Sequence, residues 1–352
     1  MENFSDLYTD YLISSSSYAT ATGMGVLLSI SHDKITRELT EKNYDSKYLW
    51  KKVKPYIEEL TNSAAPVIVS FDDSIQAKPY TDESELICWH WDHVTNRSVK
   101  GVNFLTAFAE VQGMRLPCCV DFVKKDRWIR NPKTGKRQRK SSRTKNEMFR
   151  DMIRQCYHNF AFDYVATDSW YSSTENMDFL RGKLQVNFVM AMKDNRKVAL
   201  TNQAKKEKQF ISIKSLQPGQ QPMEVWLEEL DYPLLLVKQV FKNEDDTGGE
   251  LYLVCSDLSL SYERITTIYK KRWGVEEYHK SIKSNLGFAK SPTKTIKTQS
   301  NHFILSILAY VKLEWLKQRS NQNHFAMKAR IYEAALKAAH EELKKLSTPR
   351  AA

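Results

Sequence analysis

Two short apolar runs, each followed by acidic residues, limit the possible folds more than any other feature of the sequence. Residues 66–71 (PVIVSF) are mostly apolar at both odd and even positions, as expected for a central strand that is buried on both faces. Residues 162–167 (FDYVAT) show a similar pattern. Asp72 and Asp73 follow the first run, and Asp168 follows the second. The sequence therefore predicts a covered sheet with carboxylates at the ends of two strands.

The elements between and after these runs predict a mixed α/β sheet. Residues 99–111 and 114–123 have strand patterns, residues 147–159 predict a helix, and residues 174–184 and 186–192 predict a short helix and another strand. This order suits a sheet in which the first and fourth strands lie side by side. Asp72 and Asp168 would then meet at the ends of neighbouring strands.

The remaining segments allow the chain to be divided into predicted parts. Residues 194–256 are less hydrophobic, with candidate strands at 209–213, 224–230, 234–241 and 250–255 and a hairpin turn at 244–249, and we expect an inserted β-rich subdomain. Helices are expected at 298–317 and 325–346, and the second of these, which is Ala-rich and amphipathic, could cap the core or contact a partner. We expect the following parts: a helical N-terminal segment (1–62), the first part of the core (63–193), the β-rich insertion (194–256), a core helix (257–297) and C-terminal helices (298–352).

Residues 261–287, SYERITTIYKKRWGVEEYHKSIKSNLG, predict one amphipathic helix. Ser261 is a candidate N-cap, and Gly287 and Pro292 supply the stop. An apolar flank is expected to pack on the core and consists of Ile268, Val275, Tyr278, Ile282 and Leu286. Beside this flank lies a polar stripe, whose members stand three, seven and fourteen residues after Tyr269. At these offsets the side chains fall within an arc of about 60° around the helix axis. The stripe consists of Tyr269, Arg272, Glu276 and Lys283.

The stripe has two interpretations. It could be the solvated face of an ordinary helix, or it could hold a polyanion beside a metal ion, since two cations flank a carboxylate. Asp72 and Asp168 favour the second interpretation, because Glu276 lies on a helix that should pack on their sheet. Clustered carboxylates without His or Cys ligands favour Mg²⁺ or Mn²⁺. Two such ions can activate water or a 3′-hydroxyl in phosphodiester displacement.

The charge of the chain favours a polyanionic partner. Lys and Arg outnumber Asp and Glu by 53 to 42, and the formal net charge is +11. Residues 124–150 hold twelve Lys or Arg against two acids. Residues 131–145 have almost nothing to bury, so we expect a flexible or loosely ordered loop there. Its position between a strand and a helix favours a grip on phosphates over a solvated tail. The residues of this loop that we expect to bind DNA are Lys136, Arg137, Arg139 and Lys140.

The N-terminal helices carry basic residues but no sharp helix-turn-helix signature. With candidate caps at Ser31 and Ser46, they could form a DNA-binding unit or a packing pair. Five cysteines without a CxxC pair, and no signal peptide, predict a reducing cytoplasm rather than a disulfide framework. The apolar run at 303–316 is too short and too charged to span a bilayer.

Taken together, these motifs resemble those of the DDE transposases of bacterial insertion sequences, in the insertion sequence four (IS-four) superfamily that includes the Tn-five-type enzymes. The Y-x2-R-x3-E-x6-K signature of that branch is matched by the four residues of the stripe. FDDS resembles the first-acid motif, with Asp72 followed two residues on by Ser74, and VATDSWYSS resembles the second at Asp168. The resemblance covers residues 66–303.

The resemblance implies an RNase H-like catalytic core, interrupted by a β-rich insertion before the helix that bears the glutamate. It implies that Asp72, Asp168 and Glu276 are catalytic and bind two divalent ions. Asp73 is the alternative to Asp72, because successive strand residues face opposite sides. Tyr269, Arg272 and Lys283 would bind terminal phosphates of the element.

The resemblance also implies an activity and partners. The enzyme would nick DNA at the ends of a mobile element by hydrolysis, and the 3′-hydroxyl would then attack further phosphodiesters, ending in strand transfer to target DNA. Enzymes of this superfamily often release the element through a hairpin at its ends. It would act as a homodimer in a synaptic complex, in the bacterial cytoplasm at the nucleoid. A metal-dependent nuclease that does not join DNA, and an inactive DNA-binding relative, are the alternatives.

Overall fold

The computed structural model describes residues 3–61, 65–132, 134–216, 218, 221–242 and 248–347. The chain divides into two compact units. The unit that we call the helical unit comprises Met1–Val53, Ile75–Val102 and Glu277–Ala352, and the sheet unit comprises Lys54–Ser74 and Asn103–Glu276. The elements that run from one unit into the other are α4 (Ser46–Thr61), β1 (Ile68–Ala77), β3 (Arg97–Val111) and α9 (Gly274–Asn285).

The sheet unit is built around β1 and β7 (Tyr164–Thr167), which pair in parallel and place Phe71 opposite Thr167. β8 (Asn187–Met192) pairs in parallel with β7 on its other side. β3 lies next to β1 and pairs antiparallel with β4 (Met114–Phe122). The predicted mixed sheet, with the first and fourth predicted strands adjacent, is confirmed.

The β-rich segment after β8 extends the same sheet. β13 (Gly248–Cys255) pairs antiparallel with β8, β12 (Leu234–Lys242) with β13, and β11 (Met223–Val225) with β12. Most of the hairpin turn predicted at 244–249 lies outside the described residues. The other elements here are β9 (Lys197–Val198), which pairs with β10 (Ile211–Ser212), α7 (Asn202–Lys206) and the 3-10 turn η2 (Ile213–Ser215).

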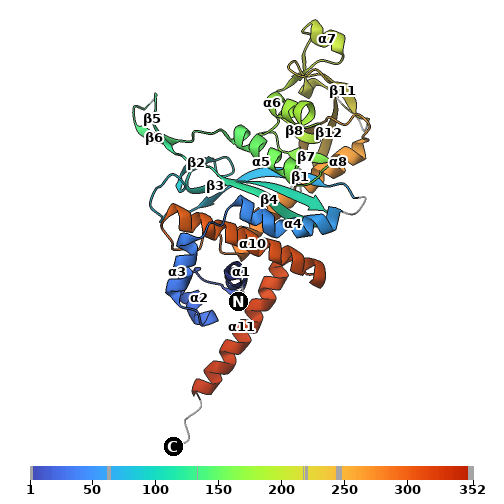
Figure 1. The fold of residues 1–352 in the computed structure, drawn as a ribbon. Coiled ribbons are helices and arrows are strands. Elements are labelled where there is room, and N and C mark those ends of the chain that lie inside the picture. The colour runs from blue at the N-terminus through green and yellow to red at the C-terminus, as the bar shows by residue number, and fades with distance from the viewer. Residues whose placement is uncertain are drawn as a thin grey trace, which may run out of the picture. The chain divides into compact units, whose positions relative to one another are not determined.

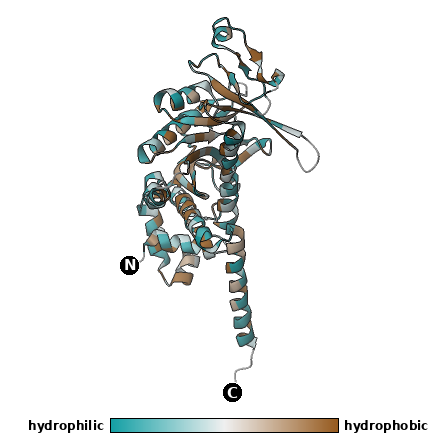
Figure 2. Ribbon diagram, turned by 90° about the vertical axis from the view of Figure 1, so that its right-hand side faces the viewer, coloured by the Kyte–Doolittle hydropathy of each residue, from teal (hydrophilic) through white to brown (hydrophobic). Residues whose placement is uncertain are grey.

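Helices α5 (Lys145–Asn159) and α8 (Tyr262–Lys271) pack on the sheet unit (Figure 1). Ile68 of β1 packs in one buried cluster with Ile268 of α8. Phe71 of β1 makes an edge contact with Phe149 of α5, with ring centroids 4.9 Å apart. Because residues 68 and 71 lie on opposite faces of a pleated strand, α8 and α5 cover opposite faces of β1. Figure 2 shows the hydrophobic residues along these strands.

One strand boundary differs from the prediction. The first strand was expected to end at residue 71, but β1 continues to Ala77, so Asp72 and Asp73 lie within it. The extension is held by backbone pairing that continues past the aspartates, where the Lys78 amide donates to the Lys100 carbonyl at 2.9 Å. The short helix predicted after β7 is present as α6 (Thr174–Asp178) followed by the π-helical turn η1 (Phe179–Lys183).

The helical unit is organised around α10 (Ile296–Ser320), most of which is buried. Asn301 of α10 donates to the carbonyls of Leu39 and Lys42 and accepts from the Tyr44 amide, which fixes the connection between α3 and α4. The unit also contains α1 (Phe4–Ser14), α2 (Ala21–Leu28), α3 (His32–Glu41), β2 (Cys88–Asp92) and α11 (His324–Ser347). Among the helices that the structure describes, none is both long enough and apolar enough to cross a membrane.

His302 of α10 is a buried, neutral side chain. Its Nδ1 lies 2.9 Å from the Tyr8 hydroxyl, and its Nε2 lies 3.0 Å from the Gly287 carbonyl oxygen. Since a carbonyl can only accept, Nε2 carries the proton and Nδ1 accepts from Tyr8. Burial lowers the pKa of His302 to about 4, against the smaller opposing effect of the bond to Gly287.

This pKa predicts that acid weakens the fold. The unfolded chain binds a proton at His302 below pH ~6.5, whereas the folded chain binds it only near pH 4. The contribution is therefore fully present above pH 6.5 and is lost as the pH falls towards 4, by about 3 kcal/mol. We expect the unfolding free energy of His302→Gln, measured in urea, to fall less steeply between pH 6.5 and 4 than that of the parent chain. Equal slopes would contradict this.

Candidate active site

Three acidic residues of the sheet unit lie close together. Phe71 pairs with Thr167, so Asp72 and Asp168 come next on two adjacent parallel strands. Glu276 lies in the first turn of α9, and one of its carboxylate oxygens is within 4.8 Å of one of Asp72. The structure thus brings together the three acids that the sequence singled out.

The surroundings of Asp72 and Asp168 disfavour their ionised forms. Burial raises the pKa of Asp72 well above its usual range, and the charges of Asp168 and Asp73 raise it further, while Arg272 lowers it. Burial also raises the pKa of Asp168, against the Trp170 amide, which donates to its Oδ1 at 3.0 Å. Groups buried beside like charges resist ionisation, and a bound cation relieves that cost. Carboxylate oxygens such as those of Asp72 and Glu276 are ligands that hard divalent cations prefer.

Asp73 has different partners, on the other face of β1. Its Oδ2 accepts from the Lys145 ammonium at 2.6 Å, and its Oδ1 accepts from the Tyr171 hydroxyl at 2.7 Å. Asp72, on the α8 face, is 3.7 Å from the Arg272 guanidinium. Of the two adjacent aspartates, Asp72 therefore lies with Glu276 and Arg272, while both oxygens of Asp73 are held by donors.

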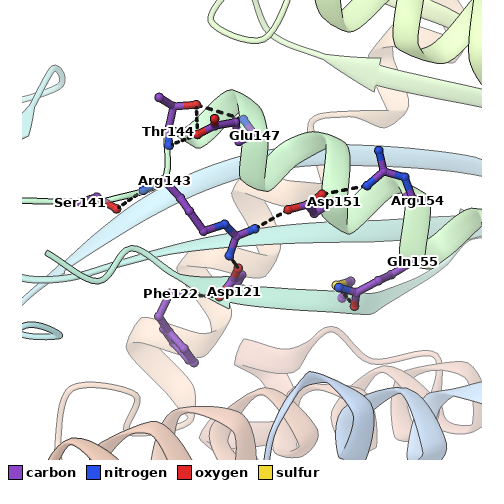
Figure 3. A network of polar contacts seen from close by, with 10 residues as sticks. Asp121, Phe122, Ser141, Arg143, Thr144, Glu147, Asp151, Arg154 and Gln155 are labelled. Carbon is purple, nitrogen blue, oxygen red and sulfur yellow. Dashed lines mark hydrogen bonds and ion pairs between the residues drawn. The ribbon is translucent and has the colours of Figure 1, made fainter. Parts of the chain in front are cut away.

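Side-chain contacts fix the position of the first turn of α5, from which Lys145 reaches Asp73. Arg143 bridges Asp121 of β4 at 3.1 Å and Asp151 of α5 at 2.7 Å (Figure 3). Thr144 and Glu147 form a capping box, with each side chain accepting from the backbone amide of the other. These contacts join α5 to the sheet immediately before Lys145.

Arg272 lies between two of the acids. Its Nη1 is 3.7 Å from both Asp72 Oδ2 and Glu276 Oε1. The Arg272 side chain is 10% exposed and that of Glu276 is 50% exposed. The guanidinium carbon is also 5.5 Å from the centre of the Tyr269 ring and 5.6 Å from that of Trp273. A buried cation is thus held beside the carboxylates by charge and by aromatic rings.

The prediction of one helix over residues 261–287 is wrong in one respect, because α8 ends at Lys271 and α9 begins at Gly274. At the break, the Arg272 amide donates to the Tyr269 carbonyl, a tight i-to-i−3 bond. A Cβ at Gly274 would come within 2.8 Å of Nε of Arg115, so a larger residue here would require the Arg115 side chain to shift.

In residues 261–287 the apolar flank matches the prediction, whereas the polar stripe matches it only in part. All five residues of the apolar flank are buried, as predicted. Tyr269, however, is only 4% exposed and packs in the core cluster with Ile268, so it is not part of a solvated stripe. Lys283 lies in the helical unit, where its ammonium donates to the Ile75 carbonyl at 3.1 Å.

The basic segment is more ordered than predicted. The segment 124–150, in which we expected a flexible loop, contains a hairpin, in which β5 (Arg127–Arg130) pairs antiparallel with β6 (Arg137–Lys140). The ring of Trp128 lies 5.3 Å from the guanidinium carbon of Arg137 and 4.4 Å from that of Arg139. Cross-strand contacts of this kind stabilise strands that composition alone would assign to a loop. The four predicted DNA-binding residues lie on this hairpin or its turn.

Sequence reasoning missed three residues of the site. Lys145 and Tyr171 hold Asp73, and the exposed ring of Trp170 lies next to Asp168. The motif DSWYSS contained a signal for two of them, since aromatic residues directly follow the second acid. Lys145 carried no such signal, because its contact with Asp73 spans 72 residues.

Two family models match the chain. The model described as DDE superfamily endonuclease matches residues 8–209, which is more than half of the chain and includes Asp72 and Asp168. The model described as Transposase DDE domain matches residues 138–312, which include Asp168 and Glu276. No curated protein matches the chain.

The partners of Asp72 and Asp73 predict opposite effects of removing each charge. In a chelator, Asp72→Asn should raise the free energy of unfolding by about 1 kcal/mol, because it removes a repelled carboxylate. Asp73→Asn should lower it by about 2 kcal/mol, because it weakens charge-assisted bonds to Lys145 and Tyr171. With added Mg²⁺, the parent chain and Asp73→Asn should gain thermal stability and Asp72→Asn should not. The reverse pattern would assign the metal to Asp73.

Proposed function

We propose that this chain, which belongs to the DDE superfamily of endonucleases, is the transposase of a bacterial insertion sequence of the IS-four type. The observation that carries the proposal is the cluster of Asp72, Asp168 and Glu276, with the buried Arg272 beside it. A cluster of repelling acids beside a buried arginine fits a centre that takes cations and phosphates together.

Asp72, Asp168 and Glu276 would hold two Mg²⁺ or Mn²⁺ ions. Such ions, when bound, make water or a 3′-hydroxyl more acidic and neutralise charge on the leaving oxygen. The raised pKa values of Asp72 and Asp168 support this assignment, because a cation stabilises the ionised forms that the fold disfavours. Asp73 would keep β1 and α5 together through Lys145 rather than bind metal.

Arg272 would contact the phosphate at the cleavage point. Its separation of 3.7 Å from both Asp72 and Glu276 exceeds that of a close hydrogen bond. Its buried Nε has no hydrogen-bond partner among the residues that the structure describes. A phosphate oxygen would satisfy this donor. Tyr269, buried against the core, would position Arg272, and Lys283 would bind a further phosphate.

The basic hairpin would bind the DNA backbone through Lys136, Arg137, Arg139 and Lys140. Trp128 would hold the two arginines in place. In the reaction that we propose, each protomer of a homodimer grips one end of the element and cuts it. The freed 3′-hydroxyl is then joined to target DNA.

The hairpin proposal predicts a specific salt dependence. Lys136 and Lys140 are exposed, and in the double variant Lys136→Gln/Lys140→Gln the stack on Trp128 is kept. Each lost phosphate contact should reduce the slope of log affinity against log salt by about 0.9. Gel-shift titrations of the duplex repeat at several salt concentrations should therefore give a slope shallower by about 2. An unchanged slope would contradict contact at the hairpin.

The catalytic assignment is tested by cleavage and joining. Asp168→Asn should reduce cleavage at the inverted repeats beside the gene on the order of 1,000-fold, because it removes a proposed metal ligand. Binding of the same DNA without divalent ions should persist. Undiminished cleavage would refute the metal site.

A joining assay of the parent chain separates the transposase from the two alternatives. The assay supplies a DNA end with a 3′-hydroxyl as donor and a supercoiled plasmid as target. Joined products support a transposase. Nicked or linear products alone would indicate a nuclease that does not join DNA, and no reaction in Mg²⁺ or Mn²⁺ would indicate an inactive DNA-binding relative.

A further inference from the structure

A buried glutamate of the sheet unit lies beside the break between α8 and α9. Glu110, near the end of β3, is 6% exposed. Its Oε1 is 3.7 Å from the ammonium of Lys271, the last residue of α8, and its Oε2 is 3.7 Å from Nε of Arg115 in β4. Each carboxylate oxygen therefore faces a different cation, and one of these cations comes immediately before Arg272 in the chain.

The second cation, Arg115, lies against the other side of the break. A Cβ at Gly274, the first residue of α9, would come within 2.8 Å of Nε and 3.0 Å of Cδ of Arg115. The Arg115 side chain thus packs on the backbone of Gly274. Arg272 lies between Lys271 and Gly274 in the chain. Glu110 and Arg115 therefore support the break at both of its ends.

The hairpin end that carries these two residues is itself fixed. Glu110 and Arg115 lie opposite each other where β3 turns into β4. The turn consists of Gln112 and Gly113, whose φ angles of 50° and 77° are those of a tight hairpin turn that matches the twist of the strands. The Gln112 side chain also donates to the Leu60 carbonyl of α4 at 2.9 Å. The break between α8 and α9 thus rests on a rigid part of the sheet unit.

We propose that Glu110 and Arg115 are positioning residues, which hold the break between α8 and α9 in the arrangement that the active site needs. The inference rests on the proposed function and names residues that act on the site without touching metal or DNA. A shift of the break by about 1 Å would move Arg272 and Glu276 relative to Asp72, and misplacement on that scale can slow a reaction about 100-fold. Desolvation offsets much of the attraction within a buried ion pair, so stability alone does not account for a charged group at Glu110.

Hydrogen exchange tests whether Glu110 holds the break, without any reaction. In Glu110→Gln both cations lose their carboxylate, so we expect the amides of residues 272–276 to exchange about 10-fold faster or more, through local opening. The amides of β7 should exchange as in the parent chain. A loss of global stability alone would instead speed exchange at β7.

Cleavage of the element's end in Mg²⁺ tests the consequence for the reaction. In single turnovers, we expect Glu110→Gln to slow cleavage about 10- to 100-fold and to bind the same DNA in a chelator as tightly as the parent chain. Lys271→Gln should share the loss of rate, whereas Lys271→Arg keeps the charge and should retain most of the rate. Glu250→Gln removes the partner of Lys238, another buried cation of the sheet unit, and should change neither the rate nor exchange at the break.

A second set of variants tests the contact between Arg115 and Gly274. Gly274→Ala adds a methyl group that must displace the Arg115 side chain, so we expect a loss of cleavage rate. Arg115→Ala should lose rate as well. The double variant should be no slower than Arg115→Ala alone, because both changes remove the same contact. Additive losses would assign the two residues separate roles and overturn the proposed support.

The proposal is overturned if Glu110→Gln leaves exchange at the break unchanged, or speeds that exchange without slowing a parent reaction that is readily measured. Faster exchange together with slower cleavage supports it. If the parent chain does not cleave DNA, the proposed function fails, and exchange alone decides whether Glu110 holds the break. If Glu110→Gln does not fold, Lys271→Gln is compared with Lys271→Arg in both assays, and equal results for these two variants overturn the proposal.

Discussion

The repulsion between the partly buried carboxylates of Asp72, in β1, and Asp168, directly after β7, is the constraint on which the site depends. Two strands that pair in parallel with Phe71 opposite Thr167 must bring Asp72 and Asp168 side by side. Burial and the proximity of like charge both raise the pKa of Asp72, so the fold carries an electrostatic cost at this position. The hydrophobic cluster of β1, β7, β8 and α8 offsets that cost by keeping the strands in register. Such strain is common where a protein is shaped for a cation rather than for its own stability.

The pleat of β1 gives two adjacent aspartates different tasks. Side chains on the α8 face meet Arg272 and Glu276, whereas those on the α5 face meet Lys145 and Tyr171. The carboxylate of Asp73 is neutralised by an ammonium and held by a hydroxyl, and this bond joins the sheet to the start of α5. A one-residue slip of β1 would exchange the two environments, so the register of the strand and the chemistry of the site are set together.

The sequence was informative where one local pattern determines the outcome. The alternation and length of the apolar runs predicted the core strands, and the apolar flank of residues 261–287 predicted the buried side of α8 and α9. It failed where distant residues decide. In the hairpin β5–β6 the ring of Trp128 meets Arg139 across the strands, and Gly274, where α9 begins after the break, lies against the Arg115 side chain. The extension of the sheet by β13 depends on its pairing with β8, more than fifty residues away. The sequence could not decide which of Asp72 and Asp73 lies with Glu276, because that choice depends on the residues that contact each face of β1.

Cations of the sheet unit are repeatedly held by aromatic rings. Arg137 and Arg139 lie near Trp128, Lys145 and Lys193 near Trp170, and Arg272 near Tyr269 and Trp273. A ring attracts a cation through its quadrupole but does not cancel the charge, whereas a carboxylate in contact cancels much of it. Where a cation must later meet phosphate, a ring is therefore the better support. Lys145 has both kinds of partner, and its short bond to Asp73 suits a structural role. Lys193 has a ring nearby and an exposed side chain, which suits contact with a polyanion. The contrast between these two lysines separates the part of the site that holds the fold together from the part that faces DNA.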